Sequence, residues 1–135
     1  MSLTAFLKEN VPDPAKEVGF VVSDRFKDEE GKPIEWKLKA MSPRRSLTLI
    51  DSSMQAKGKS TDFKSDVYSM NVVIQTVVYP PLKSAELQDS YGVMSEAGLL
   101  DAMLSAEEFN DLLLKCMDIN GLNKSDDELK DEVKN

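Results

Sequence analysis

The stretch "YPPLKSAELQDSYGVMSEAGLLDAML", residues 79–104, decides the fold class because several helix starts and stops follow one another within it. Ser84 precedes one short helical segment, which Gly92 ends, and Ser95 precedes a second segment that is rich in leucine. A serine hydroxyl at the N-cap accepts a bond from a free backbone N–H, and glycine suits the position just after a helix. We therefore predict two short helices within a mainly helical part of the chain.

Similar signals continue towards the C-terminus. Ser105 and Glu108 have the spacing of a capping box, and the helix that follows should end at Asn120–Gly121. Ser125 and Glu128 have the same spacing, so we predict a charged last helix. The apolar stripe of the helix after Ser105 consists of Phe109, Leu112, Leu113, Cys116 and Met117.

Two longer helices are predicted upstream. Ser42 followed by Pro43 is a favoured helix start, and the predicted apolar stripe of this helix is Leu47, Ile50 and Met54. Residues 55–62 form a predicted polar loop. Segment 63–78 has apolar residues every three or four positions, so we predict a helix there, although its valines also favour a strand. Its stripe consists of Phe63, Val67, Met70, Ile74 and Val77.

Near the N-terminus, after a predicted short helix in the first ten residues, the apolar period changes from three or four residues to two. "EVGFVVSDRF", residues 17–26, and "IEWKLKAM", residues 34–41, both alternate, and a polar turn separates them. This pattern predicts a β-hairpin with one buried face, on which Trp36 is the core anchor. The other members of that face are Val18, Phe20, Val22, Ile34, Leu38 and Ala40.

Together these segments predict a single α+β domain over residues 1–135. A β-hairpin or small antiparallel sheet, about residues 17–41, would pack on a helical region at about 43–134, because a lone hairpin is marginally stable. The single cysteine cannot form an internal disulfide, and no signal peptide or membrane-spanning run is evident. We therefore expect a soluble, cytoplasmic protein.

The charge is unevenly distributed. Residues 1–60 carry 11 basic and 9 acidic side chains, a net charge of +2, whereas residues 61–135 carry 6 and 15, a net charge of −9. Nucleic-acid binding requires clustered lysine and arginine, so it is not expected for this acidic chain. The acidic half would favour basic partners, or the charge would only keep the protein soluble.

No catalytic, metal or cofactor site is predicted. The chain has no histidine, and "KGKST", residues 57–61, lacks the first glycine of a phosphate-binding loop, since Ser53 stands there. Cys116 lies on an apolar stripe, where a buried structural thiol is a simpler interpretation than a catalytic nucleophile. Arg44 and Arg45 lie near a helix start and could hold an anion, but solvation is their default role. We therefore predict a non-enzymatic binding or scaffolding protein.

The sequence also resembles a known family. The resemblance rests on three segments: "MSLTAFLKENV", the hairpin "VVSDRFKDEEGKPIEWKLKAMS", and the run from "VVYPPLKSAELQDSYGVMSEAGLLDAML" through "EEFNDLLLKCMDINGL". They resemble the XkdN-like tail assembly chaperones of contractile-tailed Bacillus prophages. The resemblance implies a non-enzymatic role: binding the phage tape-measure protein and keeping it soluble, in the host cytoplasm, with no place in the mature virion.

The resemblance further implies a frameshift-extended form as an optional partner, and the sequence leaves self-association open. Two rival functions remain open: a structural tail-completion or connector protein of the virion, and a small regulatory interaction protein. The expected partner surface lies on the helices between Leu82 and Leu122, although each of these apolar residues could instead close the core. The residues chosen for this surface are Leu87, Tyr91, Met94 and Met103.

Overall fold

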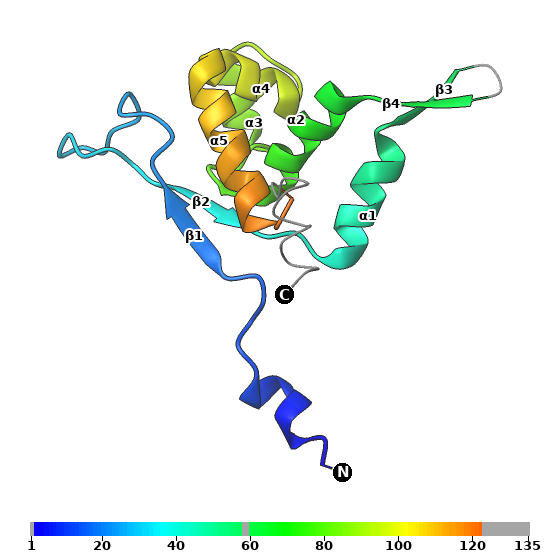
Figure 1. The fold of residues 1–135 in the computed structure, drawn as a ribbon. Coiled ribbons are helices and arrows are strands. Elements are labelled where there is room, and N and C mark those ends of the chain that lie inside the picture. The colour runs from blue at the N-terminus through cyan, green and yellow to red at the C-terminus, as the bar shows by residue number, and fades with distance from the viewer. Residues whose placement is uncertain (1, 58–59, 123–135) are drawn as a thin grey trace.

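The computed structural model describes residues 2–57 and 60–122, and it has the predicted α+β architecture (Figure 1). Helices make up most of the body, and a small antiparallel sheet lies beside them. In chain order the elements are η1 (Thr4–Phe6), η2 (Lys8–Asn10), β1 (Glu17–Phe20), β2 (Trp36–Lys39), α1 (Pro43–Ser52), β3 (Met54–Lys57), β4 (Ser60–Phe63), α2 (Ser65–Thr76), β5 (Val77–Tyr79), α3 (Ala85–Ser90), α4 (Glu96–Met103) and α5 (Ala106–Ile119).

The predicted hairpin is confirmed, and a third strand joins it. β1 and β2 pair antiparallel, with Phe20 opposite Trp36, and β5 pairs with the other edge of β2. The prediction that a helix continues to Val78 is wrong, because α2 ends at Thr76. The valines that follow have β-branched side chains, and the free edge of β2 offers them backbone partners that a helix prediction cannot foresee.

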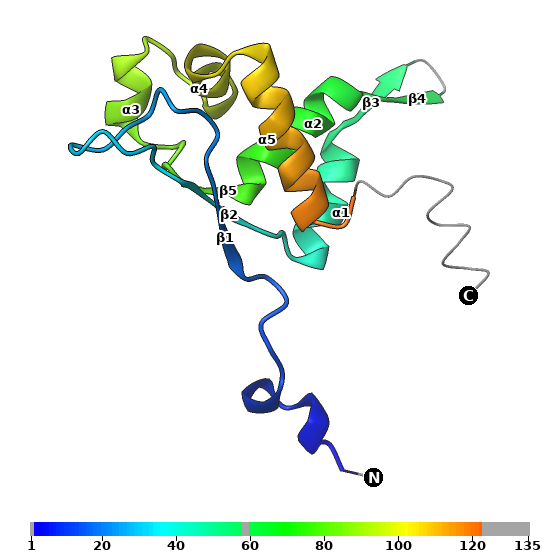
Figure 2. The ribbon, with the colours of Figure 1, turned by 60° about the vertical axis from the view of Figure 1, so that its left-hand side comes forward.

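The hydrophobic core lies between the sheet and the helices, with α2 at its centre. α2 packs against α1, α4 and α5, and Figure 2 shows α5 crossing it. Trp36 is 2% exposed, and its ring centroid lies 6.0 Å from that of Phe26. Its predicted role as a core anchor is confirmed. The buried apolar residues are Val22, Trp36, Leu38, Leu49, Val72, Val73, Leu82, Leu99, Leu100, Met103, Leu104, Leu112 and Cys116.

Two of the predicted apolar stripes are not the most deeply buried faces of their helices, although Met70, Ile74 and Val77 of the second stripe pack against the core. In α1 the buried residue is Leu49, whereas Leu47 and Ile50 are exposed. In α2 the fully buried residues are Val72, Val73 and Thr76, and these lie between the members of the predicted stripe. A helix with neighbours on several sides buries more than one face, so periodicity alone does not identify the face that is buried deepest.

The predicted loop at residues 55–62 is instead a two-stranded hairpin, and Met54, predicted to be helical, belongs to β3. The hydroxyl of buried Ser53 donates to the Leu49 carbonyl at 2.7 Å, where α1 ends. The Lys64 N–H donates to the Ser53 carbonyl at 2.8 Å. This bond holds the two ends of the segment together, so the chain between them returns as paired strands, away from the helices in Figure 1.

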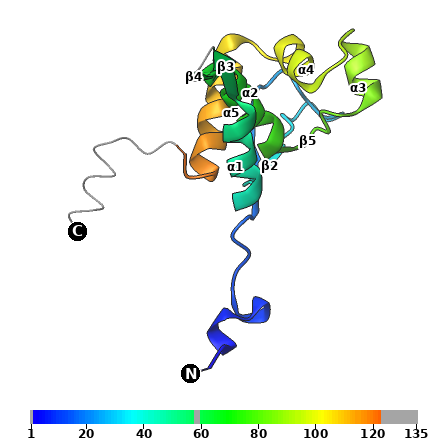
Figure 3. The ribbon, with the colours of Figure 1, turned by 90° about the vertical axis from the view of Figure 1, so that its right-hand side faces the viewer.

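The N-terminal arm, residues 2–16, extends away from the body in all three ribbon views (Figures 1, 2 and 3). The short helix predicted there is present only as the single-turn 3₁₀ segments η1 and η2. Leu3 and Phe6 are 72% and 77% exposed. The apolar side chains of the arm therefore add little to the core of this chain.

The predicted helix caps are confirmed wherever the structure describes them. The hydroxyls of Ser42, Ser84 and Ser95 each accept a backbone N–H of the first helical turn. Gly121 follows α5 with φ +70°, the left-handed conformation that favours glycine. The capping box predicted at residues 125–128 and the helix after it lie outside the described residues.

Candidate functional site

The described residues contain an apolar groove between α2, α4 and α5, with a volume of about 630 Å³. We call it the α2–α4–α5 groove. Its apolar lining consists of Met70, Leu100, Leu104, Ala106, Phe109 and Leu113. Its polar lining consists of Asp66, Ser69, Asp101, Ser105 and Asn110.

The groove has a buried floor and partly exposed walls. Leu100 and Leu104 are 1% and 9% exposed and belong to the core, whereas Met70, Phe109 and Leu113 are only half-buried. Among the residues that the structure describes, no lysine or arginine lines it. The groove therefore presents apolar surface beside carboxylates, an arrangement that suits an apolar partner with positive charge.

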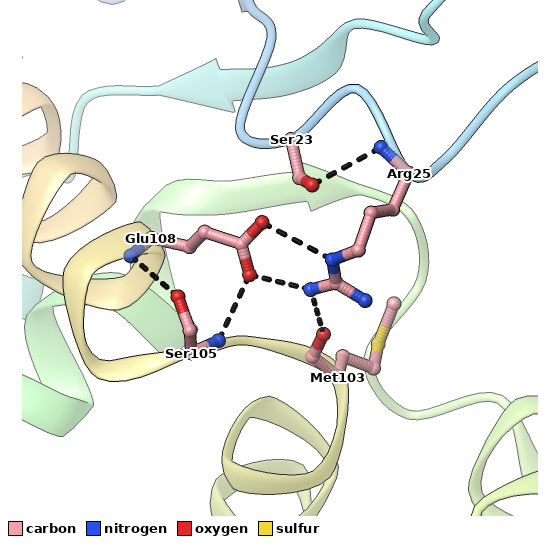
Figure 4. A network of polar contacts seen from close by, with 5 residues as sticks. All are labelled: Ser23, Arg25, Met103, Ser105 and Glu108. Carbon is pink, nitrogen blue, oxygen red and sulfur yellow. Dashed lines mark hydrogen bonds and ion pairs between the residues drawn. The ribbon is translucent and has the colours of Figure 1, made fainter.

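A polar network fixes the corner between α4 and α5, whose Ser105 also lines the groove (Figure 4). Arg25 forms an ion pair with Glu108 and donates to the Met103 carbonyl at 2.8 Å. Glu108 accepts the Ser105 N–H at 2.9 Å, and its own N–H donates to the Ser105 hydroxyl at 3.1 Å, which completes the predicted capping box. The network thus ties the connection between β1 and β2 to the helix corner that carries Ser105.

The ion pair has a marked effect on the titration of Glu108. The Arg25 guanidinium, followed by the Ser105 N–H, favours the charged carboxylate and lowers the pKa of Glu108 from 4.5 to about 2. A carboxyl whose pKa is lower in the folded state stabilises that state fully above its unfolded pKa. This stabilisation is lost as the pH falls from about 4.5 towards 2.

We expect Glu108→Gln to be less stable than the wild type at pH 7, with the difference shrinking as the pH falls towards 2. Glutamine keeps the shape of the side chain and can still accept the Ser105 N–H, so the difference reports the charged contact with Arg25. Urea unfolding of both proteins at several pH values measures it.

The matched control is Glu107→Gln, which removes a carboxylate from the adjacent exposed position of α5. Its stability should stay close to that of the wild type at each pH. A stability difference for Glu108→Gln that does not change between pH 7 and pH 2 would contradict the assigned role of the ion pair.

The residues chosen from the sequence as a partner surface do not line the groove. Tyr91 and Met94 are 39% and 97% exposed, and Leu87 is half-buried. The expectation that Met103 belongs to an exposed surface is wrong, because it is 5% exposed and packs in the core. The hydrophobic pattern of α4 cannot distinguish a residue that faces the core from one that faces a partner.

Sequence reasoning assigned the groove residues to helical stripes but not to a surface. Met70 was placed on the stripe of α2, and Phe109 and Leu113 on that of α5. The sequence did contain a signal of this surface. Val72 and Val73 make α2 apolar on a second side, which indicates that the helix has more than one apolar contact face. Only the packing of the helices shows which of these faces stays open.

The remaining polar features carry no catalytic arrangement in the part of the chain that the structure describes. Cys116 is fully buried, and this burial raises the pKa of its thiol to about 12. No group of three or more histidine, cysteine or acidic side chains could hold a metal there. Arg44 and Arg45 line a hollow of about 450 Å³ beside α1, where Arg45 donates to Gln75.

The same described residues contain no helix of sufficient length and apolar character to cross a membrane.

Comparison with known proteins identifies a matching family and a solved structure with a similar fold. The family described as "Phage XkdN-like tail assembly chaperone protein" matches residues 3–134. YqbN of Bacillus subtilis (strain 168) is 27% identical over 127 residues, which cover 90% of this chain and 85% of YqbN. The phage-like element PBSX protein XkdN of the same strain is 26% identical, with 90% and 86% covered. The crystal structure of YqbN matches with a TM-score of 0.76, covering 90% of this chain and 97% of YqbN.

Proposed function

We propose, because the chain belongs to the family of XkdN-like phage tail assembly chaperones, that it binds the tape-measure protein of its phage and keeps it soluble during tail assembly. The resemblance found in the sequence motifs is confirmed over nearly the whole chain. This family is not an enzyme class. Its members assist phage tail assembly, so phage tail proteins are the expected partners.

The observation that carries the proposal, beside the family, is the open α2–α4–α5 groove. A tape-measure protein is a very long helical chain whose exposed apolar stripes would make it aggregate alone. A small acidic protein with an apolar groove can cover such a stripe, as helix-in-groove binders do. We propose that this happens in the host cytoplasm and that the protein is absent from the mature virion.

Co-expression of the tape-measure protein with this chain tests the function. We expect the tape-measure protein to move into the soluble fraction and to co-purify with the chain at low salt. The controls are the tape-measure protein alone and the same protein with an unrelated acidic protein of similar size.

Equal solubility in all three cultures, with no co-purification, would contradict the proposed function. Mass spectrometry of purified phage particles separates it from the rival structural role. A virion component stays in the particle at a fixed stoichiometry, whereas the proposed chaperone is expected to be lost.

A further inference from the structure

We propose that the α2–α4–α5 groove binds one amphipathic helix of the tape-measure protein, a helix whose apolar stripe is flanked by lysine or arginine. This inference rests on the proposed function and adds to it the surface and the chemistry of the bound segment. Shape, exposure and charge each support it.

The shape and exposure of the groove suit the apolar stripe of a helix. Half-buried Met70 stands on one wall, and Phe109 and Leu113 stand on the other, above the buried floor. Such a groove accepts anchors spaced three or four residues apart on the incoming helix. Methionine adapts its shape at little cost, which suits a partner that offers many similar apolar stripes.

The negative charge at the rim of the groove favours a bound helix that has lysine or arginine beside its apolar stripe. Asp66 and Asp101 line the groove, and neither forms an ion pair within residues 2–57 and 60–122. A helix with positive flanks gains from this field, and one with negative flanks is repelled.

A second copy of this chain is the main alternative occupant, through its exposed N-terminal arm. Near the apolar residues Leu3 and Phe6, the arm carries one lysine and one glutamate, Lys8 and Glu9. The arm thus has no net charge there to match the acidic rim. The charge of the rim therefore favours the tape-measure helix over the arm. Binding of the arm is one of the outcomes that the sedimentation experiment below would detect.

The first experiment measures binding of two labelled helical peptides to the full chain by fluorescence anisotropy. Both peptides have about 20 residues, enough to form a helix, and the same leucine stripe, which lysines flank in one and glutamates in the other. We expect the lysine peptide to bind about tenfold more tightly at low salt, with the difference shrinking as salt screens the rim. Equal affinity at low salt, or preference for the glutamate peptide, would overturn the proposal.

The second experiment compares two substitutions at adjacent positions of α5. Leu113→Asp changes the groove wall, whereas Leu114→Asp introduces the same charge at a residue that is 52% exposed and outside the groove. We expect Leu113→Asp to weaken binding of the lysine peptide about 30-fold, as loss of a central apolar contact does. Leu114→Asp should change it less than about twofold. Equal effects of the two substitutions would overturn the proposal.

A charge-reversal pair keeps the test valid if Leu113→Asp does not fold. Asp101→Lys changes the rim, and Asp111→Lys makes the same change of charge at an exposed position of α5 outside the groove lining. We expect Asp101→Lys to weaken the lysine peptide and strengthen the glutamate peptide, each about threefold. Asp111→Lys should leave the ratio of the two affinities near that of the wild type, and a ratio unchanged in Asp101→Lys would overturn the proposal.

Co-purification with the tape-measure protein separates this inference from the function itself. If the wild type and Leu113→Asp both retain the tape-measure protein, the function stands and the groove is refuted. If the wild type does not retain it, the function fails, whatever the peptides show. Self-association of the wild type in sedimentation that both Leu113→Asp and Phe6→Asp abolish would place the arm in the groove and overturn the proposal.

Discussion

Replacing Trp36 with alanine should lower the free energy of unfolding by about 3–5 kcal/mol, the usual cost of removing a large aromatic side chain from a core. Trp36 lies on the central strand β2, opposite Phe20, and its indole packs near the ring of Phe26. It is 2% exposed, so its removal leaves a cavity in the core between the sheet and the helices. Denaturant unfolding at neutral pH measures the loss.

Leu47→Ala is the comparison for this prediction. Leu47 belongs to the apolar stripe that periodicity assigned to α1, but it is 65% exposed. Its replacement should change stability by less than about 0.5 kcal/mol, because alanine suits an exposed helix position. A loss of less than about 1 kcal/mol for Trp36→Ala would contradict its place in the core.

Replacing Asn120 with alanine should lower the free energy of unfolding by about 2–4 kcal/mol, because three hydrogen bonds are lost at once. Its side-chain oxygen accepts the Met41 N–H at 2.7 Å. Its amide donates to the Thr76 hydroxyl at 2.9 Å and to the Cys116 carbonyl at 2.8 Å. Thr76 and Cys116 are fully buried, so water cannot readily replace the lost partner. This side chain joins the ends of α2 and α5 to the segment between β2 and α1.

Asn110→Ala provides the matched control, since Asn110 is an exposed asparagine of the same helix. Its replacement should cost no more than about 0.5 kcal/mol. Thermal and urea unfolding of the two variants measure the difference. If both variants unfold like the wild type, Asn120 does not join the three segments as the structure indicates.

Features that depend on chemistry within a few residues could be predicted from the sequence. The caps at Ser42, Ser84 and Ser95 and the capping box at Ser105 require only a hydroxyl near a free N–H, so local reasoning was sufficient. The alternation around Trp36 likewise gave the buried face of the hairpin. These elements fixed the fold class and most helix boundaries.

Features that depend on distant segments could not be predicted in this way. β5 exists because β2 offers it an edge, and the β3–β4 hairpin forms between ends that the bond from Lys64 to Ser53 holds together. Asn120 was recognised only as a helix end, since nothing in the sequence indicates that Met41 and Thr76 lie beside it. Tertiary context decided each of these cases.

The candidate site shows the same limit. The hydrophobic patterns of α2, α4 and α5 identify apolar faces, but burial inside the chain and burial against a partner give the same pattern. Met103 was therefore assigned to the surface although it lies in the core, and Phe109 was assigned to a stripe although it lines an open groove. The packing of three helices, together with the Arg25–Glu108 contact at their corner, determines which apolar residues remain accessible.

The central claim is that the tape-measure protein occupies the α2–α4–α5 groove, and site-specific photo-crosslinking during co-expression tests it most directly. A photo-reactive amino acid is placed in separate variants at Asn110 on the groove lining, at Asp111, an exposed position of α5 outside that lining, and at Met94, the most exposed residue of the surface chosen from the sequence. We predict a covalent adduct with the tape-measure protein from position 110 and none from positions 111 and 94. An adduct from position 94 with none from position 110 would contradict the account.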